Sequence, residues 1–247
     1  MSKITKIVFV SNFFNHHQKF LSDELYNLIG DGYKFIATVP MNEGRKALGW
    51  KQYDLNYIEY SYKSREDYEK CMALINDADV LIVGSAPEKM VRDRIISNKL
   101  TFRYSERFLR EGLELKKFLY RFVKYRYLNP SCKSVYLLCA SAYTSEDYRK
   151  LGMFKKRAFK WAYFTEAIKY DDISHLLKSK NKTEILWCGR FLKLKHLEDV
   201  ITAVGKLVNE GYNCTLKVIG GGNEVSINEY NTIAHSTCDK EFLTFLG

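Results

Sequence analysis

Short apolar runs alternate with amphipathic stretches along most of the chain, and each kind predicts a different element. Strand-like runs stand at residues 6–10, 34–40, 79–85, 99–104, 134–141, 184–188, 214–219 and 242–246. After the first run, Leu21, Leu25 and Leu28 follow a helical spacing, and the Gly-Asp-Gly of residues 30–32 ends the predicted helix. Strands that alternate with helices in this way predict a parallel, doubly wound α/β sheet.

The second half of the chain repeats this pattern. The run at 184–188 leads through a basic loop into a predicted helix that ends near Gly211. The apolar face of that helix is expected at Leu197, Val200, Ile201, Val204 and Leu207. The run at 214–219 then leads into three consecutive glycines and another amphipathic stretch.

A polar stretch near residues 167–183 divides the chain. We expect a complete Rossmann-like domain at residues 1–168, a linker at 169–183 and a partial second Rossmann-like domain at 184–247. The second part has room for three strands, fewer than a doubly wound domain of ordinary size contains. The sequence therefore predicts a chain that ends inside its second domain, as a naturally short protein or as a piece of a longer one.

Composition predicts a folded protein without a membrane span. Of the 247 residues, 46% are hydrophobic and 28% charged, which is enough to build a core. No apolar run reaches the length of a transmembrane helix, and residues 7–10 are too short for a signal-peptide core. The cysteines form no CxxC pair, so we expect buried free thiols in a reducing compartment and a cytoplasmic protein. They are Cys71, Cys132, Cys139, Cys188, Cys214 and Cys238.

The formal net charge of +10 indicates an acidic partner, which is a nucleic acid, an anionic lipid or a phosphorylated small molecule. Residues 99–126 hold nine Lys and Arg against three Glu. Interleaved aromatic and leucine side chains suit a helix lying on the inner face of the cell membrane, while a core helix with a solvated basic face is the commoner alternative. Nucleic acid is not expected, because no binding module is recognisable.

A basic loop after the strand at 184–188 is the first candidate for chemistry. Gly189 lets the backbone turn closely beneath a ligand, and Arg190 and Lys195 stand beside the start of the following helix. Such a pair of cations can clamp a diphosphate and stabilise the charge on a departing nucleotide. From the spacing alone, two solvated side chains are an equal alternative.

The glycine-rich loop at 220–222 is a second candidate. Gly221 and Gly222 would allow a nucleoside to approach the backbone, with Glu224 available to ribose hydroxyls, whereas a plain tight turn is the structural alternative. The loop lacks the GxGxxG spacing, and no GxxxxGK[ST] motif occurs in the chain. NAD-dependent chemistry is therefore disfavoured.

Two loops of the first domain carry further candidates. His16 and His17 could contact a substrate, and Gln18 could donate to a sugar hydroxyl, although Asn15 could simply cap the helix. Adjacent histidines point in different directions on a helix, which argues against a shared metal. Farther along, Glu106 could face a sugar or could pair with Arg103 or Arg110.

Taken together, these loops resemble the family 4 glycosyltransferases of the GT-B fold. The stretch "ILWCGRFLKLKHLEDV" is similar to the family's strand, Gly-Arg, Lys and helix, and "LKVIGGGNE" and "FLTFLG" resemble the elements that follow. The family usually has glycine after the lysine, where this chain has His196. In the first domain, "SNFFNHHQ", "TFRYSERF", "VYLLCASAYTSEDYRKLGMF" and "KWAYFTE" resemble the bacterial branch that assembles surface polysaccharides.

The resemblance implies a retaining transferase that moves a sugar from a nucleotide diphosphate to a glycan or lipid-linked acceptor, with no metal or other cofactor. It implies donor-phosphate binding by Gly189, Arg190 and Lys195, and nucleoside binding at the glycine-rich loop. Donor and acceptor would face Asn15, His17 and Gln18. Candidate catalytic residues are His16 and, near the place of the family's supporting side chain in the first domain, Ser105 or Glu106. The family's Glu-x7-Glu motif would lie beyond Gly247. A catalytically inactive partner subunit that binds acceptor, membrane or another transferase is therefore the alternative.

Overall fold

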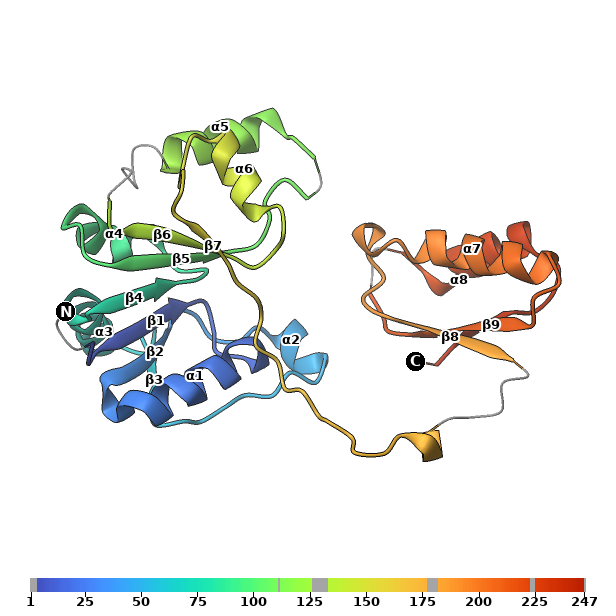
Figure 1. The fold of residues 1–247 in the computed structure, drawn as a ribbon, viewed down its shortest axis with the longest axis horizontal. Coiled ribbons are helices and arrows are strands. Elements are labelled where there is room, and N and C mark those ends of the chain that lie inside the picture. Colours follow the sequence, from blue (N-terminus) through green and yellow to red (C-terminus); the bar gives the residue numbers. More distant parts are fainter. Residues whose placement is uncertain (1–3, 111, 126–132, 177–181, 223–224, 247) are drawn as a thin grey trace. The chain divides into compact units, whose positions relative to one another are not determined.

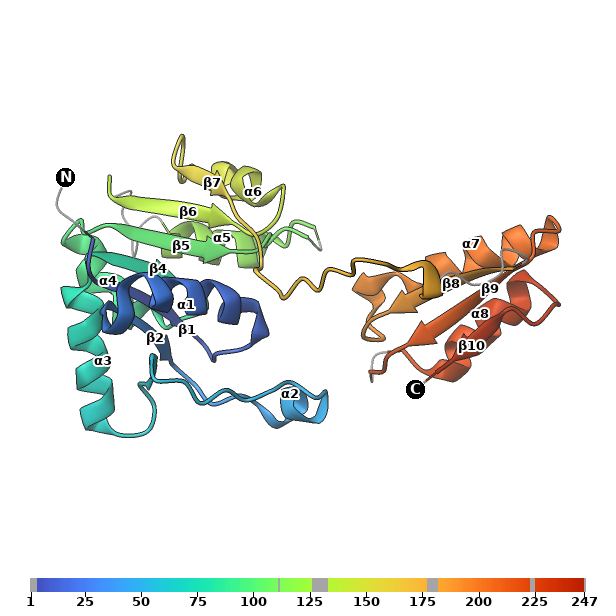
Figure 2. The same cartoon turned by 60° about the horizontal axis from the view of Figure 1, so that its bottom comes forward.

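The computed structural model describes residues 4–110, 112–125, 133–176, 182–222 and 225–246. The chain forms two compact units, Met1–Ile168 and Lys169–Gly247. Both contain parallel sheets with helices packed on them (Figures 1 and 2). The doubly wound α/β architecture expected from the alternating pattern is confirmed.

The first unit contains a sheet of seven parallel strands in the order β3-β2-β1-β4-β5-β6-β7. Its strands are β1 Ile7–Ser11, β2 Tyr33–Ala37, β3 Ile58–Tyr60, β4 Val80–Val83, β5 Thr101–Ser105, β6 Val135–Cys139 and β7 Ala158–Lys160. The order reverses between β1 and β4, and a parallel sheet with such a reversal opens a crevice there at the carboxyl ends of its strands.

Helices cover both faces of this sheet. The helices of this unit are α1 His16–Ile29, α2 Glu43–Ala47, α3 Arg65–Asp77, α4 Glu88–Ile96, α5 Leu115–Val123 and α6 Thr144–Lys150, of which the short α2 buries no residue and does not cover the sheet. Alternate residues of β1 point to opposite sides, so Val8 and Val10 pack with α3 and α4 while Phe9 packs with α1. The helix α1 forms as predicted, but Leu28 is exposed, because the face against the sheet runs through Leu25 and Ile29 instead.

A buried arginine joins several elements of the first unit. Arg94 of α4 is 1% exposed and donates to the backbone carbonyl oxygens of five residues. These are Ile75, Asn76, Ala78, Asp79 and Leu100, at 2.7–3.5 Å. The guanidinium therefore satisfies carbonyl groups in the last turn of α3, before β4 and before β5 that would otherwise lack donors.

The second unit contains three parallel strands in the order β10-β9-β8, namely β8 Thr183–Cys188, β9 Cys214–Ile219 and β10 Leu243–Phe245. Its helices are α7 Leu197–Asn209 and α8 Ile227–Thr237, and both pack on the sheet face that carries Leu216 and Val218. In α7 the buried face ends at Val208 rather than at the predicted Leu207, which is exposed.

The cysteines do not all behave as the sequence suggests. Cys71, Cys139, Cys214 and Cys238 are buried and unpaired, as expected, and Cys132 lies outside the described residues. Cys188 was expected to be buried but is exposed. Along β8 the side chains of Ile185 and Trp187 take the inward positions, so the alternation of a strand turns Cys188 outward.

Candidate functional site

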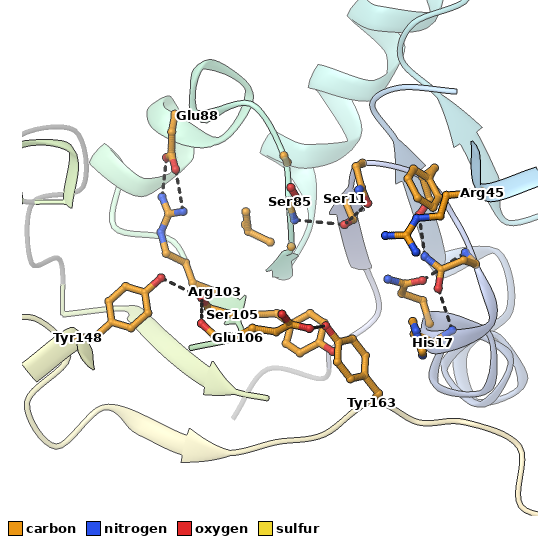
Figure 3. Close-up of a pocket in the computed structure, with 18 of the residues that line it drawn as sticks. Ser11, His17, Arg45, Ser85, Glu88, Arg103, Ser105, Glu106, Tyr148 and Tyr163 are labelled. Carbon is orange, nitrogen blue, oxygen red and sulfur yellow. Dashed lines mark hydrogen bonds and ion pairs between the residues drawn. The ribbon is translucent and has the colours of Figure 1, made fainter. Parts of the chain in front are cut away.

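A cavity of about 450 Å³ opens in the first unit at the carboxyl ends of β1, β4 and β5. It lies where the strand order reverses, the position at which open α/β sheets bind ligands. The lining combines hydroxyl, amide, aromatic and charged side chains (Figure 3). They include Ser11, Asn15, His17, Gln18, Arg45, Trp50, Ser85, Glu88, Arg103, Tyr104, Ser105, Glu106, Lys124, Tyr125, Tyr148 and Tyr163.

The amino end of α1 borders this cavity and is closed by a capping box. The Asn15 side chain accepts a hydrogen bond from the backbone N–H of His17 at 2.9 Å, and Gln18 Oε1 accepts from the backbone N–H of Asn15 at 3.2 Å. Asn15 and Gln18 are buried. The capping alternative raised by the sequence is therefore observed, and both residues line the cavity as well.

The two adjacent histidines occupy different surroundings. His17 lines the cavity, whereas His16 is absent from its described lining and packs its ring on His17 and Trp50, with centroid separations of 4.1 and 4.7 Å. Burial, together with the nearby His16 and Arg45, lowers the pKa of His17. His17 therefore presents a neutral imidazole near neutral pH, and its Nδ1 is buried without a hydrogen-bond partner among the described residues.

Glu106 follows β5 and is half exposed at the edge of the cavity. Tyr163 donates a hydrogen bond to its carboxylate, and Arg110 lies 3.6 Å from it. The pairing with Arg110 was one of the alternatives raised by the sequence, whereas Arg103 pairs elsewhere. The carboxylate raises the pKa of Tyr163, as does burial of that phenol, which contributes most. The Glu106 carboxylate is thus held by Tyr163 in the lining of the cavity (Figure 3).

Side chains of α6 hold the loop that carries Glu106. Asp147 of α6 is fully buried and accepts hydrogen bonds from the backbone N–H of Leu109 at 2.9 Å and from Arg107 at 3.3 Å. Tyr148, its neighbour, donates to Ser105 Oγ at 3.1 Å. These contacts set the backbone on which Glu106 stands, and they already engage the Ser105 hydroxyl.

An ion-pair network around the buried Arg103 and the half-buried Glu88 and Lys124 lies in the cavity wall, and no sequence pattern predicted it. Arg103 of β5 binds Glu88 through both terminal nitrogens at 3.2 and 2.8 Å, and Lys124 lies 3.1 Å from the same carboxylate. Paired donors of this kind fix a carboxylate in one orientation. The available signal was a charged residue inside a strand-like run, "TFRYS".

An aromatic platform beside α2 was also missed. The guanidinium of Arg45 lies 4.4 Å from the centroid of the Trp50 ring, and Trp50 packs edge-on against His16 and Phe13. Both Arg45 and Trp50 line the cavity. This platform adds a cation and an apolar ring surface to the same pocket.

In the second unit, the two loops singled out by the sequence lie against each other. The backbone N–H of Gly189 donates to Ile219 at 3.0 Å, and that of Phe191 donates to Gly221 at 2.9 Å. Gly220 has a φ of 145°, and a Cβ there would fall on the Gly189 carbonyl. By contrast, a Cβ on Gly221 would meet nothing within 4 Å. Glycine at position 220 is required by the fold, while Gly221 borders open space.

Arg190 and Lys195 are exposed on this pair of loops. Within the described ranges, neither side chain has a hydrogen-bond or ion-pair partner. His196, which follows Lys195, has a φ of 52°, the left-handed region that favours glycine and tolerates histidine better than most residues. Its Nδ1 lies 3.3 Å from Asp199. Histidine in place of the glycine usual in the resembled family is therefore compatible with the left-handed turn into α7.

Three further expectations concern Glu224, metal binding and membrane-spanning helices. Glu224, the candidate for the ribose hydroxyls, lies outside the described residues. Over the ranges that are described, no group of three or more His, Cys, Asp or Glu side chains is arranged to hold a metal ion. None of the helices in those ranges is long and apolar enough to cross a membrane.

Comparison with solved structures identifies the fold. HepE of Anabaena, in a crystal structure with UDP and glucose, matches 98% of this chain over 69% of its own length, at 12% identity and a TM-score of 0.59. The lipopolysaccharide outer core galactosyltransferase WaaB matches 98% of the chain over 68% of its own, at 13% identity and a TM-score of 0.55. An alpha-glucosyltransferase (AGT) in complex with UDP matches 95% over 62%, at 13% identity and a TM-score of 0.52.

These neighbours are GT-B glycosyltransferases, and the chain has the same fold. No protein-family model matches the sequence, and a search of curated proteins found no significant match. The similarity is one of backbone architecture, because only about one residue in eight is identical.

Proposed function

We propose that this chain is a glycosyltransferase that binds a nucleotide-diphosphate sugar at the loops 189–196 and 220–222 of its second unit. The observation that carries the proposal is the pair of exposed cations, Arg190 and Lys195, beside the open backbone at Gly221. The fold supports it, since structural neighbours at this level of similarity contain UDP. These neighbours resemble the chain in backbone architecture alone.

The two cations would act on the leaving group. The phosphates of the donor carry negative charge that grows when the bond between the anomeric carbon and the diphosphate oxygen breaks. A guanidinium binds phosphate oxygens in pairs, and an ammonium adds a point charge beside it. Electrostatic stabilisation placed where charge develops lowers the barrier of such a reaction.

We propose transfer with retention of configuration at the anomeric carbon. The acceptor oxygen forms its bond on the face from which the diphosphate departs, and the hydroxyl proton passes to the leaving phosphate oxygen. No protein nucleophile is required in this scheme.

The cavity of the first unit would present the acceptor. Glu106 is an oriented carboxylate in its lining, and His17 is a neutral imidazole in its wall. A carboxylate there can accept a hydrogen bond from an acceptor hydroxyl. We assign this supporting role to Glu106 and a hydrogen-bonding role to His17, while His16 shapes the platform around Trp50.

The wider assignment rests on sequence resemblance. Membership of family 4, a role in surface-polysaccharide synthesis and a glycan or lipid-linked acceptor all follow from the motifs in both halves of the chain. The polar and aromatic lining of the cavity suits a sugar, which offers hydroxyls at its edges and apolar C–H faces.

Calorimetric titration with UDP tests the donor site. We expect Arg190→Ala and Lys195→Ala each to weaken UDP binding about tenfold, the loss that follows from one charge-assisted hydrogen bond. Lys206→Ala, which removes an exposed lysine of α7, is the matched control and should leave the affinity unchanged. Equal affinities in all four proteins would overturn the clamp assignment. UDP binding without release of UDP from UDP-sugars in the presence of acceptor would instead favour a non-catalytic partner subunit.

A further inference from the structure

The loop that begins with α2 holds an arginine beside a tryptophan in the cavity of the first unit. The side chain of Asn42 caps α2 by accepting a hydrogen bond from the backbone N–H of Arg45 at 2.9 Å. At the other end of the loop, the backbone N–H of Trp50 donates to the carbonyl oxygen of Arg45 at 3.1 Å. The segment 42–50 is therefore closed on itself, and its hydrogen bonds bring Arg45 and Trp50 together.

The ring of Trp50 sets the position of the Arg45 guanidinium. The guanidinium carbon lies 4.4 Å from the centroid of the ring, which packs edge-on against His16 and His17 at 4.7 and 5.7 Å. Arg45 and Trp50 are both half-buried, and both line the 450 Å³ cavity. A guanidinium held over a ring keeps the N–H groups at its edge for an oxyanion, and it loses little freedom when it binds one.

The other cations of this cavity are engaged within the protein. Arg103 and Lys124 share one carboxylate of the cavity wall, at 2.8 and 3.1 Å. The acid of α2, Glu43, pairs with Lys46 at 2.7 Å. Over the ranges that the structure describes, no carboxylate lies within ion-pair distance of Arg45. Arg45 is therefore the cation that this lining can offer to an anion from solution.

The histidine next to this platform adds a neutral hydrogen-bonding group. Burial lowers the pKa of His17 most, His16 and Arg45 lower it further, and the Glu106 carboxylate opposes them. The imidazole is therefore uncharged near neutral pH and does not compete with Arg45 for an anion. Figure 3 shows Arg45 and His17 on one side of the pocket and Glu106 nearer its centre. The cavity thus has a cationic side and, apart from it, a carboxylate held by Tyr163.

We propose that Arg45 binds an anionic substituent of the acceptor sugar, a carboxylate or a phosphate, and that it thereby selects an acidic sugar over a neutral one. The inference rests on the proposed function, which assigns the acceptor to this cavity. Carboxylate and phosphate both present pairs of oxygens that match a guanidinium. A sugar bound in this way places its anion at Arg45 and a hydroxyl near Glu106, so the two charged groups also fix its orientation.

NMR titration of the full chain at pH 7.5 tests this selectivity. The ligands are methyl glucuronide, glucose 6-phosphate, neutral methyl glucoside and inorganic phosphate. We expect at least one acidic sugar to bind about tenfold more tightly than methyl glucoside, the difference that one charge-assisted hydrogen bond supplies. Which of the two acidic sugars binds more tightly identifies the substituent. Inorganic phosphate, which lacks the sugar ring, should bind more weakly than either preferred ligand.

Substitutions of Arg45 test whether this residue is responsible. Arg45→Gln should lower the affinity for the acidic sugar about tenfold and leave that for methyl glucoside unchanged. Arg45→Lys keeps the charge but not the paired donors, so it should restore only part of the affinity. Lys46→Gln is the matched control, because it removes the same charge from the next position of α2, at a side chain outside the described lining. It should bind as the unaltered chain does, and thermal melts confirm that each variant is folded.

Several results would overturn the proposal. They are equal binding of acidic and neutral sugars, no binding of either acidic sugar, and binding of inorganic phosphate as tight as that of the preferred acidic sugar. An equal loss in Arg45→Gln and Lys46→Gln would also overturn it, because the effect would then come from net charge rather than from a contact at Arg45.

UDP titration of the same variants separates this proposal from the transferase function. UDP should bind Arg45→Gln as it binds the unaltered chain, because the donor phosphates are assigned to Arg190 and Lys195. A loss of UDP affinity in Arg45→Gln would make Arg45 a donor contact and overturn the inference. Selective binding of an acidic sugar without UDP binding removes the transferase function and leaves the anion site, whereas UDP binding without that selectivity removes only the anion site.

Discussion

The two units of the chain use their basic residues differently. Around the cavity of the first unit, Arg103 and Lys124 share the carboxylate of Glu88, and Arg107 pairs with the buried Asp147. In the second unit, Arg190 and Lys195 are exposed and have no such partners within the part of the chain that the structure describes.

The difference is between cations that are already paired within the protein and cations that are exposed to bind a ligand. A cation paired with a buried carboxylate holds the protein together, and a ligand must compete with that carboxylate for it. For the exposed Arg190 and Lys195, the described part of the chain contains no carboxylate that competes with a ligand in this way. The contrast therefore favours the second unit as the site for the phosphates of a nucleotide, while Arg45, stacked on the Trp50 ring, is the cation that the first unit adds to its own pocket.

Removing a structural cation should have the largest effect. Arg94→Leu withdraws the guanidinium from five backbone carbonyls and should destabilise the first unit by about 3 kcal/mol or more. UDP affinity, which we assign to the second unit, should be unchanged under conditions where the variant is folded. Urea denaturation followed by tryptophan fluorescence measures the stability.

Arg92→Leu is the control for that substitution, because Arg92 is exposed on the same helix. A similar loss of stability in both variants would mean that Arg94 contributes through general helix charge rather than through its carbonyl partners.

A smaller effect is expected from His17. Burial lowers the pKa of His17 in the folded chain, so between that value and the unfolded value of about 6.5 the unfolded state binds a proton that the folded state does not. Stability should therefore be lost as the pH falls through and below about 6.5, and His17→Gln should reduce the slope. Thermal melts across this range measure it. His235→Gln, at an exposed histidine of α8, should leave the slope as it is, and an equal change in both variants would contradict the assignment.

Much of the fold was predictable because it depends on periodicity. The longer strands and the helices α1 and α7 were recognised from apolar spacing and from the glycines that end the helices. The edge strands β3 and β7 were missed, because "IEY" and "AFK" each include a charged residue and stand in no longer apolar run, unlike β10 within "FLTFL". Spacing alone does not fix where a buried face is centred. The predictions therefore buried three side chains that are exposed, Leu28, Leu207 and Cys188.

The candidate site was predictable only where it is local in sequence. The strand, Gly-Arg, Lys and helix order led to Arg190 and Lys195 without knowledge of the fold. The network of Glu88, Arg103 and Lys124 joins α4, β5 and the end of α5, and no local sequence pattern predicts a contact between residues so far apart in the chain. The sequence also could not decide which histidine faces the cavity, because that depends on the phase of α1 as it packs.

The most direct test of the account is hydrogen–deuterium exchange of the full chain with and without UDP, resolved by peptide. The account predicts that UDP slows exchange at residues 189–196 and 220–222 and leaves residues 12–18 and 103–107 of the first unit unchanged. Protection confined to those first-unit segments would place the nucleotide in the 450 Å³ cavity and contradict the assignment of the donor to the second unit.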